Sequence, residues 1–191
     1  KIPDHSTIWL FRERLIATGK DTAIWEELQR QIDQKGLTIR RGVIQDASFI
    51  ASEPGHARAD TPRGDQAKTR RSRDGTWTKK GSKSYFGYKL HILLDKDHQL
   101  IRRITTTTAS LHDSQIDLSE MGETIYRDKG YFGVKPRASM DKTMRRAVRN
   151  HPLSLKEKRR NKAISRTRSL VERPFAVIKT EFRAGYVRVT T

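Results

Sequence analysis

The chain has 191 residues and no cysteine, which excludes disulfide bonds and thiolate metal sites. Forty Lys and Arg against 22 Asp and Glu give a formal net charge of +18, which favours a polyanionic partner, above all nucleic acid, over a merely basic protein. No apolar run is long enough to span a bilayer and no signal-peptide pattern is present, so a soluble cytoplasmic protein with no membrane partner is expected.

Residues 1–36 are predicted to form a helical N-terminal segment, and residues 37–191 the main domain. Ser6 or Thr7 is expected to cap the first helix, Asp21 or Thr22 the second, and Gly36 to end it. Because the sequence starts at Lys1 rather than at Met, we expect a fragment of a longer chain. Apolar residues at helical spacing predict a buried face on each helix: Ile8, Trp9, Phe11 and Leu15, then Ile24, Trp25, Leu28 and Ile32.

Residues 37–51 are predicted to contain a strand, because they are rich in β-prone apolar residues. Asp46 interrupts the run from Val43 to Ile50. An unpaired buried carboxylate costs several kcal/mol, so Asp46 needs a partner. The sequence leaves two interpretations open, a buried ion pair and a metal ligand.

Residues 52–84 are polar and basic, and are predicted to form a long loop, with order resuming near Trp77. This stretch contains a basic group suited either to phosphates or to a solvated linker: Lys68, Arg70, Arg71 and Arg73.

Residues 85–95 and 99–108 are predicted to form a hairpin, in which His91 is a packed or hydrogen-bonded residue rather than a ligand. Ser110 or Asp113 is expected to open a short helix that reaches Met121. Asp113 is interpreted either as the cap of that helix or as a support for a nearby site.

Residues 123–126 are predicted to form a short strand, with Asp128 at its C-terminal end. Functional side chains gather at such strand ends in open α/β sheets, although a simple turn aspartate is the alternative. Gly130 and Gly133 permit a sharp exit from the strand. Residues 140–148 are a candidate edge strand.

A long basic helix is predicted from the capping box Ser154–Glu157 onwards. Pro174 should bend it just past Glu172, because it lacks the N–H that would bond to Leu170. One face of the helix is apolar, with Ile164, Val171, Phe175, Ile178 and Phe182 at helical spacing. A second face carries Arg168, Glu172 and Lys179, which predicts either a solvated Arg168–Glu172 ion pair or a functional carboxylate among bases.

In this order of elements the sequence resembles the DDE transposases of bacterial insertion sequences, specifically the insertion-sequence-five group of the type-four superfamily. The resemblance runs from about residue 4 to the end of the chain. Four patches carry it: residues 43–50, residues 85–91, residues 109–114 together with 126–131, and residues 168–179.

The resemblance implies an α/β, ribonuclease-H-like fold, with a mixed five-stranded sheet flanked by helices. It implies that Asp46, Asp128 and Glu172 are the catalytic residues and metal ligands. Arg168 and Lys179 match the arginine and lysine of a tyrosine-arginine-glutamate-lysine signature, whereas Ser165 stands in the tyrosine place. The contacts expected with DNA come from Arg168, Lys179, Arg159 and Arg160.

Three carboxylates without a nearby thiol or His pair also favour hard cations, so Mg²⁺ or Mn²⁺ is expected, as two ions. The expected function is metal-dependent strand cleavage and strand transfer at insertion-sequence ends. The expected partner is double-stranded DNA, bound by a homodimer in the bacterial cytoplasm at the nucleoid. The alternatives are an inactive DNA-binding remnant of a transposase and another nuclease of the same fold.

Overall fold

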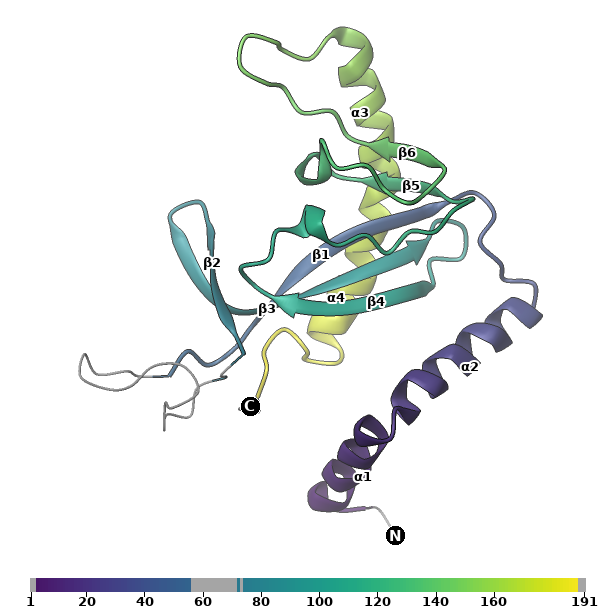
Figure 1. The fold of residues 1–191 in the computed structure, drawn as a ribbon, viewed down its shortest axis with the longest axis vertical. Helices are drawn as coiled ribbons and strands as arrows, with labels where there is room; N and C mark the ends of the chain where they lie inside the picture. Colours follow the sequence, from purple (N-terminus) through teal and green to yellow (C-terminus); the bar gives the residue numbers. More distant parts are fainter. Residues whose placement is uncertain (1–2, 56–71, 73, 189–191) are drawn as a thin grey trace. The chain divides into compact units, whose positions relative to one another are not determined.

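The computed structural model describes residues 3–55, 72 and 74–188. Its contacts divide the chain into two compact units, Lys1–Thr38 and Ile39–Thr191. The first unit contains helices α1 (His5–Ala17) and α2 (Lys20–Gln34), as predicted for this segment (Figure 1). The second unit contains a six-stranded sheet and the long C-terminal helical segment.

The ends of the two N-terminal helices differ from the predicted ones. Asp4 caps α1, because its Oδ1 accepts a hydrogen bond from the Thr7 backbone N–H at 2.7 Å. Helix α2 begins after Gly19, whose φ of 65° is accessible to glycine without strain. The predicted buried faces are wrong within this structure, since no residue of α1 or α2 is buried and Trp9 is 47% exposed. Two short helices alone are too small to cover their own apolar residues.

The sheet is mixed, as predicted, but it has six strands instead of five. Its strand order is β2-β3-β1-β5-β6, with β4 paired to β3, and β1, β5 and β6 are parallel neighbours. The additional strand, β2, lies inside the stretch predicted to be a loop. The bounds are β1 Val43–Ala51, β2 Thr76–Lys80, β3 Lys83–Asp95, β4 Ile101–Thr108, β5 Thr124–Arg127 and β6 Met140–Thr143.

The basic group predicted in the loop before β2, residues 68, 70, 71 and 73, lies outside the described residues. Strand β2 itself forms because Thr76–Lys80 pairs antiparallel with the first residues of β3, extending the central hairpin. Trp77 of β2 contacts Phe86 of β3, with ring centroids 5.4 Å apart, a cross-strand aromatic pair that stabilises this pairing.

The C-terminal helical segment consists of α3 (Leu155–Arg168), a 3₁₀ turn (Ser169–Val171) and α4 (Glu172–Thr180). The predicted capping box is confirmed at its start, where Ser154 and Glu157 exchange side-chain to backbone hydrogen bonds. The irregular turn lies before Glu172, not after it as predicted. The reason is that Pro174 removes the hydrogen bond to Leu170, and Leu170 lies inside the 3₁₀ turn.

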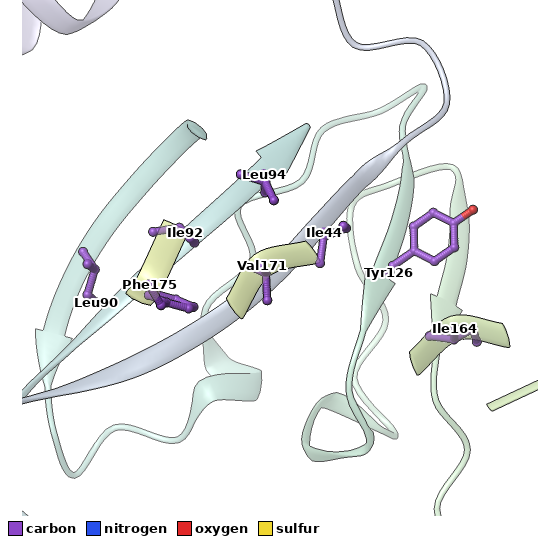
Figure 2. Close-up of a cluster of buried hydrophobic side chains, with 8 residues drawn as sticks. All are labelled: Ile44, Leu90, Ile92, Leu94, Tyr126, Ile164, Val171 and Phe175. Atoms are coloured by element: carbon purple, nitrogen blue, oxygen red, sulfur yellow. The ribbon is translucent and has the colours of Figure 1, made fainter. Parts of the chain in front are cut away.

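The main core joins one face of the sheet to this helical segment (Figure 2). The predicted apolar stripe is confirmed for Ile164, Val171 and Phe175, which are buried, and wrong for Phe182, which is 74% exposed. Because side chains alternate along a strand, Ile44 in this core places Asp46 on the same face of β1 as the helices. The sheet contributes Ile44, Leu90, Ile92, Leu94 and Tyr126.

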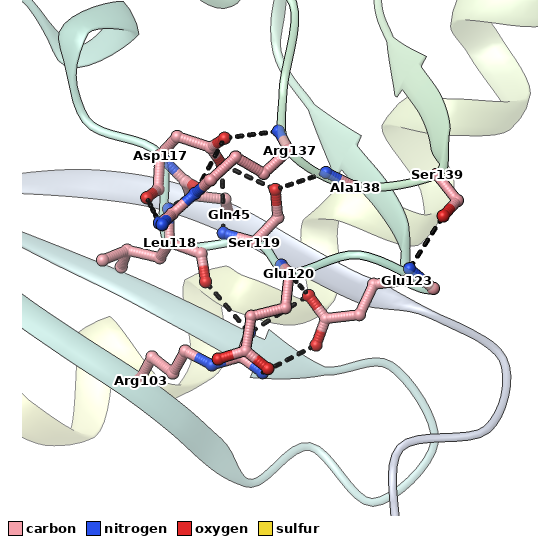
Figure 3. A network of polar contacts seen from close by, with 11 residues as sticks. Gln45, Arg103, Asp117, Leu118, Ser119, Glu120, Glu123, Arg137, Ala138 and Ser139 are labelled. Atoms are coloured by element: carbon pink, nitrogen blue, oxygen red, sulfur yellow. Dashed lines mark hydrogen bonds and ion pairs between the residues drawn. The ribbon is translucent and has the colours of Figure 1, made fainter.

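The opposite side of β1 is held by polar contacts (Figure 3). Buried Gln45 donates from Nε2 to the Ile116 carbonyl at 2.7 Å and accepts from the Leu118 N–H at 3.0 Å. Arg103 of β4 also donates to the Leu118 carbonyl, at 2.9 Å. These contacts use the backbone groups that a helix would need, so the helix predicted after Ser110 is only the 3₁₀ turn η2 (Asp113–Gln115).

Strand β6 is also shorter than predicted, because it ends at Thr143. The Asn161 side chain of α3 bonds to both the N–H and the carbonyl of Arg145, each at 2.8 Å. Those bonds replace the ladder bonds that would continue the strand, so the chain turns away here.

Candidate active site

Asp46 lies in the middle of β1, with its side chain 24% exposed. Its Oδ1 accepts from the Ala47 N–H at 3.0 Å, and its Oδ2 accepts from Arg168 Nη2 at 2.8 Å. Arg168 therefore pairs with an aspartate far away in the sequence and not with Glu172, its neighbour one turn along the helix. The sequence left two interpretations open for Asp46, a buried ion pair and a metal ligand. The structure contains the ion pair, with Arg168.

The charge of Asp46 is only partly compensated. Burial raises the pKa of Asp46, the Arg168 guanidinium and the Ala47 N–H lower it, and the carboxylate of Asp128 raises it, with a net increase. The carboxylate of Asp128 is therefore one of the charged groups that act on Asp46. Two like charges held in this way favour a bound cation.

Asp128 follows the last residue of β5 and caps the 3₁₀ turn η3 (Lys129–Tyr131), accepting a hydrogen bond from the Gly130 N–H. A side chain at position 130 would place its Cβ 2.8 Å from Asp128 Oδ1, so a larger residue there would push the Asp128 carboxylate out of its present position. Strands β1 and β5 are parallel and pair only at Val43 and Ile44. Continued by two residues, this register sets Asp128 opposite Asp46, beyond the point where the two strands stop pairing.

Glu172 is the first residue of α4 and is exposed. Arg168 and Lys179 lie on the same helix face as Glu172, one before it and one after it. Arg168 bonds to Asp46, and Lys179 lines a cavity together with Ser48. Within the described part of the chain, however, no three His, Asp or Glu side chains are grouped closely enough to hold a metal ion. The structure thus sets Asp128 at the end of the strand that runs parallel to the strand of Asp46, and leaves Glu172 on the adjacent helix.

Two basic cavities lie in this part of the domain, the first lined by the residues that follow Asp46 in β1 and the second in part by Asp128. The first, of about 440 Å³, includes Lys79, Lys80 and Lys179 in its lining, and the second, of about 590 Å³, is lined in part by Asp128, Lys129, Arg145 and Arg146. Both are large enough for segments of a polyanion. Of the two helix arginines predicted to contact DNA, Arg159 is exposed and Arg160 donates to the Thr143 carbonyl at 2.7 Å.

Asp113 is not the cap of η2, since His112 has that role and accepts from the Ser114 N–H. Asp113 instead pairs with Lys89 Nζ at 2.8 Å. His91 is hydrogen-bonded as predicted, with Nε2 2.8 Å from Thr107 Oγ1.

Tyr131 was not among the predicted site residues. It is only 2% exposed. Burial and the charges of Asp46, Asp113 and Asp128 raise the pKa of its hydroxyl, and a side-chain hydrogen bond with Gln45 lowers it, with a net increase. Its position three residues after Asp128 is the sequence signal that points to it.

Replacing Asp46 by asparagine is expected to stabilise the folded chain. The pKa of Asp46 is raised above its usual 3.8, so ionisation of this group lowers stability as the pH rises through the folded-state value. Asparagine does not ionise and can still accept a hydrogen bond from Arg168. Urea unfolding should therefore show a larger advantage for D46N at pH 7 than at pH 3. A lower stability of D46N at pH 7 would show that the Arg168 ion pair outweighs the cost of burial.

Residues 37–191 match the family described as Transposase DDE domain. The chain is 28% identical over 192 residues to the transposase for insertion sequence element IS1106 of Neisseria meningitidis serogroup B, an alignment that covers 91% of this chain and 66% of that relative. The chain thus spans about two thirds of the length of this relative. No solved structure matches. No helix in residues 3–55 and 74–188 is both long and apolar enough to cross a membrane.

Proposed function

Because this chain belongs to the DDE transposase family, we propose that it catalyses metal-dependent DNA strand cleavage and strand transfer at the ends of an insertion sequence. The observation that supports this most directly is the parallel register of β1 and β5, which sets Asp128, at the end of β5, next to the strand that carries Asp46. A pair of carboxylates in a strongly basic chain suits chemistry on a phosphodiester.

The donor atoms fit a hard divalent cation in kind, since they are carboxylate oxygens in a chain without thiolates. Asp46, Asp128 and Glu172 would hold Mg²⁺ or Mn²⁺, as two ions. Bound in this way, the ions would polarise the scissile phosphate and stabilise the leaving 3′-oxygen. Arg168 now neutralises Asp46 Oδ2, at 2.8 Å, so this guanidinium occupies a place that a cation would take.

The substrate we propose is double-stranded DNA, bound by a homodimer at the bacterial nucleoid in the cytoplasm. Lys179 and Arg168 lie on the helix face of Glu172 and would hold phosphates on both sides of it, with Arg159 and Arg160 further along the helical segment. The two basic cavities would accept the strand on either side of the acids.

The test is a nicking assay with purified protein and plasmid DNA that carries the element's ends. Nicked or joined products should form with Mg²⁺ or Mn²⁺ and disappear with a chelator. The alternative of an inactive remnant draws support from the Asp46–Arg168 pair and from the absence of a three-acid group among the described residues. It predicts DNA binding without products at any metal concentration.

Removing the charge of Lys179 is expected to weaken DNA binding and its dependence on salt. Each phosphate contact releases about one counterion, so the slope of log K against log salt should fall by about 1 in Lys179→Gln. Fluorescence anisotropy with labelled duplex over a KCl series measures this slope. Arg137→Gln is the control, because Arg137 pairs with Asp117 and lines neither cavity. Equal slopes for the two variants would exclude Lys179 from the phosphate contacts.

A further inference from the structure

Two lysine side chains converge on the Tyr126 hydroxyl, at the edge of the main core. Lys96 Nζ lies 3.4 Å and Lys142 Nζ 3.2 Å from Tyr126 Oη, so both ammonium groups donate to the same oxygen. They also lie 5.0 and 5.1 Å from the centre of the ring. Figure 2 shows the Tyr126 hydroxyl pointing away from Ile44 and Val171, its neighbours in the core.

The sheet holds this arrangement in place. Strands β5 and β6 are parallel, and their register sets Lys142 opposite Tyr126, so the two side chains lie on the same face of the sheet. Lys96 comes from the turn after β3, where its backbone N–H donates to the Gly42 carbonyl at 3.0 Å. The two ammonium groups therefore reach one oxygen from separate parts of the chain, each fixed by backbone hydrogen bonds.

No carboxylate compensates these two positive charges. The carboxylates next to the two lysines in the chain are bound elsewhere: Asp95 to His98, Asp97 to Arg41 and Asp141 to Arg127. Within residues 3–55, 72 and 74–188, neither Lys96 nor Lys142 has an ion-pair partner. Both side chains are only half-buried, so a ligand can reach them from the solvent.

The group of three side chains suits an anion with several oxygens. An ammonium group only donates hydrogen bonds, and the Tyr126 hydroxyl, which accepts from both lysines, still has its own O–H to donate. Burial raises the pKa of Tyr126, whereas its hydrogen bonds with Lys142 and Lys96 and their charges lower it, with a net decrease. Negative charge is therefore favoured at this position, and a phosphate group supplies both the charge and the acceptors.

We propose that Lys96, Lys142 and the Tyr126 hydroxyl form a binding site for one phosphodiester group of the DNA backbone. The site is separate from the phosphate contacts proposed for Lys179 and Arg168, and it rests on the proposed function because it takes DNA as its ligand. Tyr126 precedes Asp128 by two residues, about 7 Å at the rise of a strand. A phosphate bound here would fix the path of the DNA strand close to the candidate acids.

The experiment measures the binding of labelled duplex DNA over a KCl series, by fluorescence anisotropy. The double variant Lys96→Gln with Lys142→Gln should lower the slope of log K against log salt by about 1, the value for one phosphate contact. Arg30→Gln with Arg137→Gln is the charge-matched control, because these arginines have carboxylate partners in Glu27 and Asp117. The control should leave the slope unchanged, and circular dichroism checks that both variants fold.

Tyr126→Phe separates the hydroxyl from the charges. Phenylalanine keeps the ring in the core and removes the oxygen on which the two ammonium groups meet. Duplex binding should weaken, because the lysines are no longer held together, while the salt slope should stay near that of the unaltered chain, because both charges remain.

Four results would contradict the site. They are a slope for the double lysine variant equal to that of the control, a decrease of about 2, which means two separate phosphates, and unchanged duplex affinity in Tyr126→Phe. The fourth is protection against urea by inorganic phosphate, compared with chloride at equal ionic strength, together with equal slopes, which would make free phosphate the ligand. The nicking assay tests the proposed function separately. The expected slopes without nicking would leave this site standing and overturn the function, whereas nicking with equal slopes would do the reverse.

Discussion

Replacing Asp128 by asparagine should lower the rate of metal-dependent DNA cleavage by about a thousandfold or more, with the fold intact. Asparagine keeps the size of the side chain and can still accept from the Gly130 N–H, so the cap of η3 survives. What is lost is one negative charge opposite Asp46, and with it a ligand of the cation. A loss of about 4 kcal/mol in transition-state stabilisation corresponds to that factor.

Single-turnover nicking of plasmid DNA at saturating Mn²⁺ measures this effect, with circular dichroism as the check on folding. Asp97→Asn is the matched control, because Asp97 pairs with Arg41 and lies apart from the proposed ligands in the sequence and in its contacts. If Asp128→Asn cut DNA at a rate within tenfold of the unaltered chain, Asp128 would not be a catalytic ligand.

Replacing Arg127 by alanine should destabilise the main domain by about 3–5 kcal/mol, the cost of breaking a buried charged contact. Arg127 is fully buried, and its guanidinium donates to Thr143 Oγ1 at 2.8 Å and to the Val134 carbonyl at 2.7 Å. It also lies 5.4 Å from the centre of the Tyr131 ring. Its loss would leave a cavity next to Asp128 in the chain and would remove the donor to Thr143 Oγ1 and to the Val134 carbonyl.

Urea denaturation followed by tryptophan fluorescence and circular dichroism measures this change. Arg137→Ala is the control, because the Arg137 side chain is 68% exposed and should matter by less than about 1 kcal/mol. Stability losses of similar size in the two variants would show that Arg127 does not anchor the end of β5.

Local features of the fold were predictable because neighbouring residues determine them. The capping box at Ser154 and Glu157 needs only residues within one turn, and the apolar spacing of Ile164, Val171 and Phe175 needs only the period of a helix. Gly130 allows the close turn at Asp128 for a similarly local reason.

The errors concern groups whose partners lie far away in the sequence. A helix was expected after Ser110, but Gln45 binds the backbone of that segment from a strand about 70 residues earlier. Strand β2 was taken for a loop, because its polar residues pair with β3 through backbone bonds that leave no apolar pattern. Arg168 was placed beside Glu172 by helical spacing, yet it bonds to Asp46.

The amino-acid sequence alone determined the basic character of the chain, the family resemblance and the identity of the three candidate acids. Only the tertiary structure set Asp128 at the end of a strand parallel to β1 and paired Arg168 with the second oxygen of Asp46. The physical reason is that helix and strand patterns arise from neighbouring residues, whereas the position of a buried charge depends on strand register and on packing across the whole domain.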